Sequence, residues 1–202
     1  MVVVGLTGSI AMGKSTTAGM FRAFGWPVFD ADLAVHDLMR PGGEAVAAVL
    51  AAFPDVASPA SGIDRAELGR AVFGDPAALK RLEAVVHPRV RRAEERFLAH
   101  ARRRGERAAL LDIPLLFEGG GSRRCDLTVV ASASRHLQAV RALARPGMTR
   151  ARLDAILAKQ MPDREKRRRA DFVVRTGLGR AVALADVRAV VRIVEARDQE
   201  RR

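Results

Sequence analysis

The chain has 202 residues and a formal net charge of +12 at pH 7, with 35 Lys and Arg against 23 Asp and Glu. This length allows one α/β domain with an insertion, and no apolar run reaches the ~18 residues expected of a membrane span. The N-terminus enters a strand directly, without the basic region or cleavage site of a signal peptide. The single cysteine, Cys125, allows no internal disulfide, which fits a reducing compartment. We therefore expect a cytoplasmic protein without membrane contact.

The positive charge is nearly all arginine, because lysine occurs only at positions 14, 80, 159 and 166. A basic chain can bind a polyanion, either nucleic acid or a phosphate-rich small molecule. Side chains that stack on bases are scarce, since Tyr is absent and Trp26 is alone. The dispersed arginines indicate solvated helix faces, so a nucleic-acid partner is not expected.

A glycine-rich loop near the N-terminus carries the clearest chemistry. Residues 8–15 follow the pattern G-x-x-x-x-G-K-S and lie between an apolar run, residues 2–4, and a helical stretch, residues 17–24. The β-branched run predicts a buried parallel strand. Loop N–H groups closed by a helix N-terminus bind phosphates. Lys14 is therefore expected to reach the β- and γ-phosphates of a nucleotide, and the Ser15 hydroxyl to bind Mg²⁺. The alternative, an ordinary glycine-rich turn, is disfavoured by the flanking strand and helix.

Two carboxylates follow the second predicted strand, within residues 27–32. Ligands of open parallel sheets bind beyond the carboxyl ends of the strands, so Asp30 and Asp32 are expected on the same edge as the phosphate loop. If the strand continues through both, their side chains share one side. We expect Asp32 to accept a hydroxyl proton or to hold Mg²⁺-bound water. Either residue can instead cap the next helix, and Asp30 is interpreted as mainly structural.

Residues 33–105 are predicted to be helical, with no convincing strand. Helices are expected near residues 33–40, 44–53, 65–73, 76–87 and 89–104, with a polar loop at 55–62. Asp64 and Asp75 supply caps, and Pro88 is expected to end a helix at His87. This insertion on the ligand edge is a place for a phosphoryl acceptor. Its basic residues are candidate partners of acceptor phosphates, although a solvated face is the more ordinary interpretation of each: Arg65, Arg89, Arg91 and Arg92.

An apolar strand at residues 108–112 brings Asp112 to its carboxyl end. Pro114 cannot donate to a central ladder, so the strand should end before it. Asp112 is thus placed like the acidic residue that holds Mg²⁺ through water in phosphate-loop enzymes. The remaining core is predicted as a fourth strand, a fifth strand, a last helix and a frayed tail, at residues 126–131, 170–175, 181–196 and 197–202.

An arginine-rich helical hairpin is predicted over residues 134–160, with a turn at Pro146-Gly147. A lid of this kind excludes water and brings Arg onto a transferring phosphoryl group. Arg141 is the first candidate for that contact and Arg145 the second. The alternative is that both lie on a solvated face.

Together these residues resemble the dephospho-CoA kinase family over nearly the whole chain. The resemblance rests on residues 5–8 and 13–15, Asp30-Ala31-Asp32, Leu82-Glu83, His87-Pro88, the D-I-P-L-L-F-E run at 112–118, Gln138, Arg141, Arg145, Gln160 and residues 170–174. The phosphate loop is widespread, but the D-x-P-L-L-F-E run and the His-Pro pair in this order are specific.

The resemblance implies an α/β fold of the P-loop NTPase type, with a parallel five-stranded sheet flanked by helices, a helical substrate-binding insertion and a helical lid. The nucleotide-binding core is expected over residues 1–32, 106–136 and 166–202. The acceptor insertion is expected over residues 33–105 and the lid over 137–165.

The resemblance also implies ATP-dependent phosphorylation of the ribose 3′-hydroxyl of dephospho-CoA, giving coenzyme A and ADP, with Mg²⁺ as cofactor. Catalysis is assigned to Asp32 as base, with Lys14 and Arg141. ATP contacts are assigned to Gly8, Ser9, Ile10, Ala11, Met12, Gly13, Lys14, Ser15, Thr16, Arg141, Arg145 and Thr176. Acceptor contacts are assigned to Asp32, His87, Pro114, Leu115 and Leu116. Mg²⁺ is assigned to Ser15 directly, and to Asp32 and Asp112 through water.

Some positions depart from the family pattern. Ser9 and Ala11 stand where glycine is common, and both are small enough for the loop. Thr176 stands where the family usually has Asn, so only the backbone path beside the adenine is expected to be kept. Another phosphate-loop kinase acting on a nucleoside or metabolite stays open, as does a nucleic-acid-binding NTPase or nucleotide switch, although the N-K-x-D guanine signature is absent. We expect ATP and dephospho-CoA as partners of a monomer, with an oligomer left open.

Overall fold

The structure is a computed structural model that describes residues 1–58 and 62–200. Its contacts divide the chain into two compact units, which are Met1–Phe29 with His100–Arg202, and Asp30–Ala99. Within the described residues, none of the helices combines the length and the apolar character needed to cross a bilayer.

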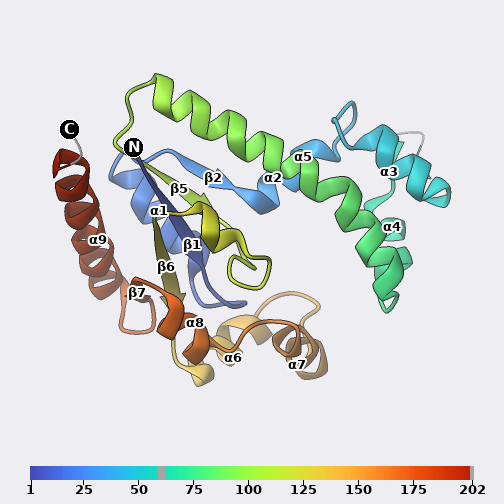
Figure 1. Cartoon of the computed structure of the whole chain (residues 1–202). Helices are drawn as coiled ribbons and strands as arrows, with labels where there is room; N and C mark the ends of the chain where they lie inside the picture. Colours follow the sequence, from blue (N-terminus) through green and yellow to red (C-terminus); the bar gives the residue numbers. More distant parts are fainter. Residues whose placement is uncertain (59–61, 201–202) are drawn as a thin grey trace. The chain divides into compact units, whose positions relative to one another are not determined.

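The first unit is built on a parallel sheet of five strands in the order β2-β5-β1-β6-β7 (Figure 1). The strands are β1 Val2–Thr7, β2 Val28–Asp30, β5 Ala108–Asp112, β6 Leu127–Ser132 and β7 Phe172–Arg175. Every residue of the three central strands is buried. Their apolar runs fit this position, because a parallel sheet covered on both faces has no polar side. The predicted five-stranded parallel sheet is therefore confirmed.

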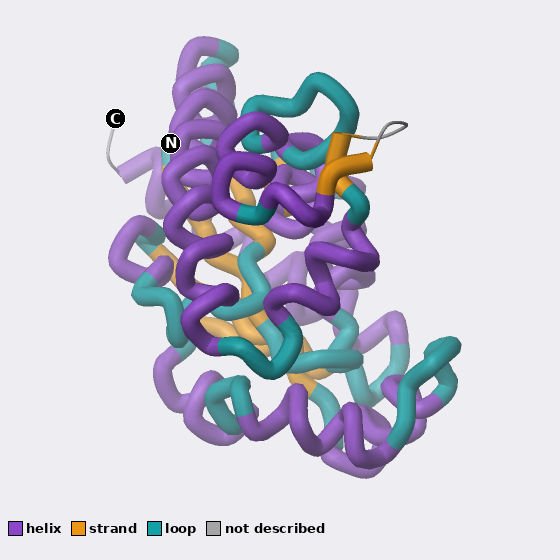
Figure 2. Tube along the Cα trace, turned by 90° about the vertical axis from the view of Figure 1, so that its right-hand side faces the viewer, coloured by secondary structure: helices purple, strands orange, loops and turns teal. Residues whose placement is uncertain are grey.

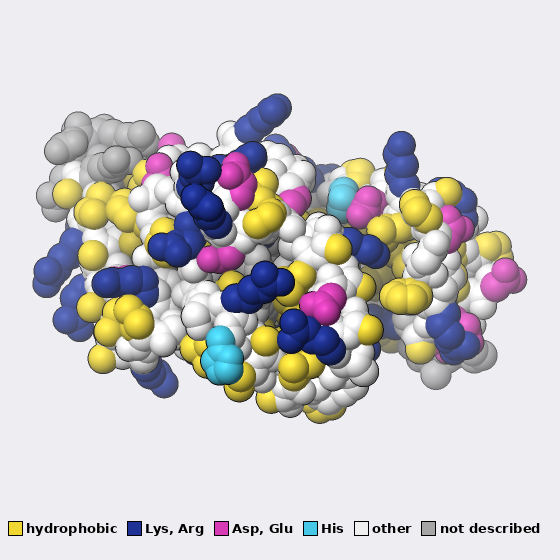
Figure 3. Space-filling view, turned by 90° about the horizontal axis from the view of Figure 1, so that it is seen from below, with side chains coloured by type: hydrophobic (Ala, Val, Ile, Leu, Met, Phe, Trp, Pro, Cys, Tyr) yellow, Lys and Arg dark blue, Asp and Glu magenta, His cyan; other side chains and the backbone are white. Residues whose placement is uncertain are grey.

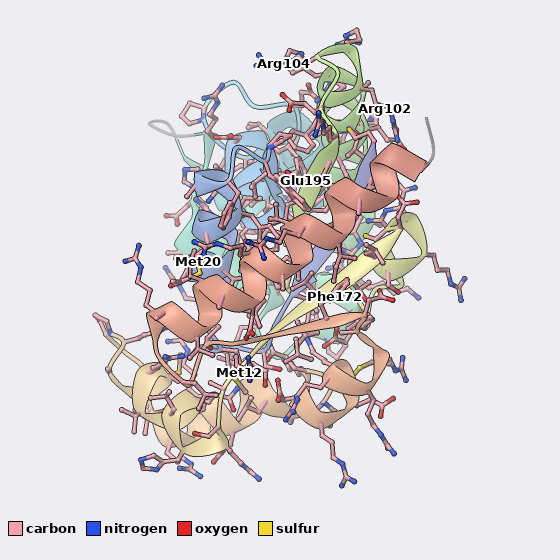
Figure 4. All side chains as sticks on the ribbon, turned by 90° about the vertical axis from the view of Figure 1, so that its left-hand side faces the viewer. Met12, Met20, Arg102, Arg104, Phe172 and Glu195 are labelled. Carbon is pink, nitrogen blue, oxygen red and sulfur yellow. The ribbon has the colours of Figure 1, made fainter. Side chains whose placement is uncertain are left out.

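Two helices from opposite ends of the chain share one core with the sheet. α1 Lys14–Ala23 and α9 Arg180–Glu200 pack with β1, β6 and β7 around Phe21, which is fully buried. The Phe21 ring lies 5.0 Å from the Trp26 ring. Figure 4 shows α9 running across the strands near the labelled Phe172 of β7. The predicted end of α9 at residue 196 is wrong, because the helix continues to Glu200 through residues with good helix propensity. Residues 201 and 202 lie outside the described part.

Three short helices lie at the end of the sheet where β1 ends (Figure 1). They are α6 Arg135–Leu143, α7 Arg150–Ala158 and α8 Asp163–Arg169, and the turn η2 Gly121–Arg124 precedes β6. Ser134 and Thr149 cap α6 and α7 as their sequence positions predict. α8 was not predicted. Its acidic first turn and basic last turn complement the helix dipole, so a helix can form directly after Pro162.

The second unit is mainly helical. Its elements are α2 Ala31–Leu38, α3 Val46–Ala52, η1 Pro54–Val56, β3 Ala57–Ser58, β4 Gly62–Ile63, α4 Arg65–Val72 and most of α5 Pro76–Arg103. A separate apolar cluster around Val49, Ile63, Leu68 and Val86 holds these elements together.

Two predictions for this unit are wrong. The segment contains a short antiparallel pair, β3 with β4, visible beside the grey trace in Figure 2. Strands of two residues are too short to show a periodic pattern, and residues 59–61 of the predicted polar loop lie outside the described part. The predicted break at His87 is also absent, because α5 runs through Pro88. A proline inside a helix costs about 3 kcal/mol, which the apolar packing of α5 offsets through residues such as Ala78 and Val86.

Candidate active site

The phosphate loop joins β1 to α1 through a backbone that small residues favour. Gly13 has φ 88° and Ala11 has φ 60°, both left-handed conformations. A Cβ added at Gly8 would lie 2.8 Å from the carbonyl oxygen of Ala131, so this position has no room for a side chain. α1 begins at Lys14, and the N–H groups of its first turn have no acceptor within the helix. The loop and this turn therefore form an anion site.

The lysine of the loop pairs with the aspartate predicted to accompany it. Lys14 Nζ donates to Asp112 Oδ1 at 2.7 Å, and the Asp112 side chain is 2% exposed. The pairing follows from the sheet, because the β1–β5 register sets Leu6 beside Asp112. The sheet thus brings an ammonium group and a carboxylate together beside the loop.

The residues present suit Mg²⁺ bound together with a nucleotide. No cluster of three His, Cys, Asp or Glu side chains capable of holding a metal exists in residues 1–58 and 62–200. The loop offers the exposed Ser15 hydroxyl, and β5 offers the Asp112 carboxylate. One hydroxyl and one carboxylate match the usual manner of Mg²⁺ binding, in which substrate phosphates and water supply most ligands.

Two glutamines from the segment predicted to be a lid hold the middle of the phosphate loop. Gln138 Nε2 donates to the Ile10 carbonyl at 3.0 Å, and the Ile10 N–H donates to Gln160 Oε1 at 3.0 Å. Gln138 is buried, being 4% exposed. Both polar groups of the Ile10 backbone are therefore satisfied by side chains from residues 137–165.

Thr176, at the end of β7, also contacts this loop. Its hydroxyl lies 2.6 Å from the Met12 carbonyl, to which it donates, and 3.1 Å from the Ser132 carbonyl. Arg141 Nη2 donates to the Thr176 carbonyl at 2.9 Å, and Nη1 lies 3.4 Å from the Thr176 hydroxyl. The predicted lid arginine thus lies beside the phosphate loop, with further N–H donors left for phosphate oxygens. Figure 4 marks the position of Met12.

The P-L-L segment after β5 is fixed from two sides. The Pro114 carbonyl accepts from the Thr7 hydroxyl at 2.8 Å and lies 3.4 Å from Lys166 Nζ. Leu115 is 45% exposed, so its side chain is open to a ligand. Leu116 is fully buried, and its side chain lies against Gly5 of β1. An acceptor contact at Leu116 would have to come from its backbone.

An ion pair between a buried lysine and a more exposed glutamate joins this segment to α8. Lys166, fully buried, lies 2.9 Å from Glu118 Oε1, which also accepts from the Met161 N–H at 2.8 Å. Burial raises the pKa of Glu118, but the hydrogen bonds from Lys166 and Met161 outweigh this effect, and the net pKa lies below its ordinary value. The carboxylate form of Glu118 is therefore the form that stabilises the fold.

The predicted acceptor residues outside the P-L-L segment lie in the unit of residues 30–99. β2 ends at Asp30, whose side chain caps α2 by accepting from the Leu33 N–H at 3.0 Å. The strand does not continue through Asp32, which instead lies exposed in the first turn of α2. Capping by Asp30 explains why the chain turns into a helix here. His87 is exposed on α5, one residue before Pro88.

Arginines elsewhere are mixed with other side chains. On the face shown in Figure 3, Lys and Arg are interspersed with Asp, Glu and hydrophobic groups. Arg145 and Thr16, both predicted ATP contacts, are exposed. Ser9 is buried, and its carbonyl accepts from the Met12 N–H at 3.1 Å.

Sequence reasoning gave no role to Gln138, Gln160, Glu118 and Lys166. Gln138, Gln160 and Glu118 belong to the motifs on which the family resemblance rests, so the resemblance could have indicated them. Lys166 had another signal, because lysine is scarce in this arginine-rich chain and two of its lysines, at positions 14 and 166, form the ion pairs described above.

Comparison with known proteins agrees with this geometry. The family model described as dephospho-CoA kinase matches residues 2–179. The chain is 64% identical over 167 residues to a dephospho-CoA kinase of Paramagnetospirillum magneticum, covering 83% of this chain and 78% of that protein. It is 56% identical to a dephospho-CoA kinase of Mesorhizobium japonicum, over 95% of each chain. The crystal structure of TT1252 from Thermus thermophilus superposes with a TM-score of 0.84 at 35% identity, covering 94% of this chain and 95% of that one.

The parallel sheet, the glycine-rich loop and the Lys14–Asp112 pair define a phosphate-loop kinase, a transferase that uses a nucleotide. Within that class, the chain belongs to the dephospho-CoA kinase family.

Replacing Thr176 tests its contact with the phosphate loop. Thr176→Val keeps the branched shape and removes the hydroxyl that bonds the Met12 carbonyl. A hydrogen bond of this kind contributes about 1 kcal/mol, so we expect MgATP to bind about fivefold more weakly. Thr176→Ser keeps the hydroxyl and should bind MgATP as the wild type does. Calorimetric titration measures both, and equal affinity in the valine variant would remove this role.

The Glu118–Lys166 pair predicts a pH effect on stability. Because the folded-state pKa of Glu118 is lowered, its contribution is complete above its unfolded pKa of about 4.3 and is lost as the pH falls through the folded value. Glu118→Gln should lower the unfolding free energy at pH 7 and reduce its further loss below about pH 4.3. Urea unfolding between pH 3 and pH 7 measures this. Glu165→Gln, from an exposed pair with Arg169, is the control; a Glu118→Gln curve parallel to the wild type would contradict the assignment.

Proposed function

We propose that this protein transfers the γ-phosphoryl group of ATP to the 3′-hydroxyl of the ribose of dephospho-CoA, giving coenzyme A and ADP. The observation that carries this proposal is the family match over residues 2–179, which contains the complete phosphate loop with its Lys14–Asp112 pair. A kinase of another small molecule and a nucleic-acid-binding NTPase are not favoured, because relatives that share 49–64% identity with the chain are named as dephospho-CoA kinases.

The donor nucleotide is assigned to the loop of residues 8–16. Its phosphates would accept from the N–H groups of the first turn of α1, which have no partner within that helix. Lys14 is assigned to the β- and γ-phosphates, exchanging its bond with Asp112 for phosphate oxygens. Arg141 lies against the loop through Thr176 and is assigned to the charge that develops on the transferring group.

Mg²⁺ is the cofactor in this proposal. Ser15 would bind it directly, and Asp112 and Asp32 through water, as the oxygen ligands that Mg²⁺ prefers. When bound, the ion neutralises charge on the β- and γ-phosphates.

The acceptor is assigned to the helical insertion of residues 33–105, with contacts from Asp32, His87 and the segment 114–116. Asp32 is exposed in the first turn of α2, whereas Asp30 is used as the cap of that helix. The exposed Leu115 is the side chain of the P-L-L segment open to a ligand. The lid of residues 137–165 is assigned to water exclusion during transfer.

The transfer itself is one displacement at phosphorus. The ribose 3′-oxygen forms a bond to the γ-phosphorus, and the bond from that phosphorus to the β–γ bridging oxygen breaks. The hydroxyl proton passes to Asp32, and ADP leaves with the bridging oxygen. The protein contributes mainly position and charge, because the transition state for phosphoryl transfer needs little covalent help.

Acceptor competition tests the proposed reaction. Purified protein with MgATP should form ADP rapidly with dephospho-CoA, and slowly with nucleosides or nucleoside monophosphates at equal concentration. ADP formation is followed by a coupled assay. Faster transfer to a nucleoside, or ADP formation that ignores every acceptor, would contradict the proposed acceptor while keeping the nucleotide site.

Asp32→Asn tests the base. The amide cannot take the hydroxyl proton, so we expect kcat to fall by about 10²–10⁴-fold with little change in MgATP affinity. Asp37→Asn, an exposed aspartate on the same helix, is the matched control and should keep wild-type kcat. A wild-type rate in Asp32→Asn would remove Asp32 from this role.

A further inference from the structure

One cavity of the unit of residues 30–99 gathers basic side chains. It has a volume of about 370 Å³ and is lined by His36, Met39, Arg40, Pro41, Ile63, Asp64 and Arg65. These residues come from α2 and the turn after it, and from β4 and the start of α4; Figure 1 labels the two helices. The cavity lies entirely within one unit of the chain.

Among the described residues of this unit, some arginines pair with carboxylates, whereas the two arginines of this cavity, like Arg89 and Arg92, do not. Arg70, Arg91 and Arg96 each form an ion pair with a glutamate. Within residues 1–58 and 62–200, Arg40 and Arg65 form no such pair with a carboxylate. Two guanidinium groups that line one cavity without carboxylate partners favour an anion as its ligand.

The other polar groups of the cavity agree with an anionic ligand. Arg65 Nη1 donates to His36 Nδ1, so the ring carries its proton on Nε2 and keeps a second donor. The one carboxylate in the lining, Asp64, is used to cap α4: its Oδ1 accepts from the N–H groups of Ala66 and Glu67, each at 2.9 Å. The lining therefore offers several side-chain donors, and one oxygen of its single carboxylate is used within α4.

The register of α2 connects this cavity to the proposed base. Asp32 and His36 are four residues apart on one helix, so they share a face and are separated by about 6 Å along the axis. Both are exposed, and Arg40 follows just after the helix ends. The basic cavity thus begins one helical turn from Asp32.

We infer that His36, Arg40 and Arg65 bind the diphosphate group of the acceptor. This inference rests on the proposed function, in which Asp32 receives the proton of the ribose 3′-hydroxyl. In dephospho-CoA the diphosphate is attached to the 5′-carbon of the same ribose, only a few bonds from that hydroxyl. One helical turn is a matching separation, and guanidinium forks suit phosphate oxygens.

Such a site explains how the reacting hydroxyl is positioned. A diphosphate held by two arginines fixes one side of the ribose and directs the 3′-hydroxyl toward Asp32. A nucleoside without a 5′-diphosphate lacks this anchor. The cavity is therefore a specificity site for the acceptor and has no role in holding ATP.

The direct test is titration of dephospho-CoA into the protein without ATP, combined with steady-state kinetics. Arg65→Gln should weaken dephospho-CoA binding about tenfold or more and raise its KM similarly, with the KM for ATP within about twofold of wild type. Arg40, whose side chain makes no hydrogen bond or ion pair among the described residues, gives a second variant. Arg40→Gln should act in the same direction, and it tests the inference if Arg65→Gln disturbs the fold. Arg70→Gln, on the same helix as Arg65 and paired with Glu67, is the control and should change neither constant.

The outcomes separate this inference from the proposed function. Unchanged dephospho-CoA affinity in both Arg65→Gln and Arg40→Gln, or an equal rise in the KM for ATP, overturns the inference even if the wild type makes coenzyme A. Loss of dephospho-CoA binding in these variants supports the inference. If the wild type nevertheless transfers phosphate to another acceptor, that result overturns the proposed function and leaves the inferred binding site in place. Weakening in Arg70→Gln of the same size would overturn the inference as a nonspecific charge effect.

Discussion

The left-handed backbone of the phosphate loop is the constraint on which the site depends. Gly13 adopts its positive φ freely, but Ala11 at φ 60° carries a cost of about 1–2 kcal/mol. The surrounding chain supplies what holds this conformation. Gln138 and Gln160 bond the residue before Ala11, and Thr176 bonds the residue after it. These contacts come from residues 137–165 and from the residue after β7, so segments far along the chain contribute to the shape of one loop.

The same arrangement links the nucleotide side of the first unit to the segment after β5. Lys14 of the loop contacts Asp112 at the end of that strand, and the next turn of chain is held by Lys166 through Pro114 and Glu118. A fully buried lysine is stable only with such partners. Lys166 of α8 is therefore bonded to the P-L-L segment. A substitution at Glu118 or Lys166 should disturb both α8 and that segment.

Much of the first unit could be predicted because its signals are local: short β-branched runs, a glycine loop and capping side chains. The wrong predictions concern elements whose structure depends on tertiary packing rather than on a local sequence pattern. α5 passes through Pro88 because its apolar face is buried, and the pair β3 with β4 is too short for any periodicity. α8 was not predicted because Pro162 was interpreted only as the residue that ends the preceding helix, whereas it is also the N-cap residue of the next one. The motifs name candidate site residues, but the partners of Thr176 and Lys166 lie far along the chain and no local pattern encodes them.

The position of the transferred phosphate tests the proposed reaction most directly. Wild-type protein is incubated with dephospho-CoA and ATP labelled at the γ-phosphate, and the product is analysed by mass spectrometry and phosphorus NMR. If dephospho-CoA is phosphorylated as proposed, we expect one added phosphate, present as a monoester on the ribose 3′-oxygen and carrying the label. Label released as inorganic phosphate, or attached at any other position, would contradict it.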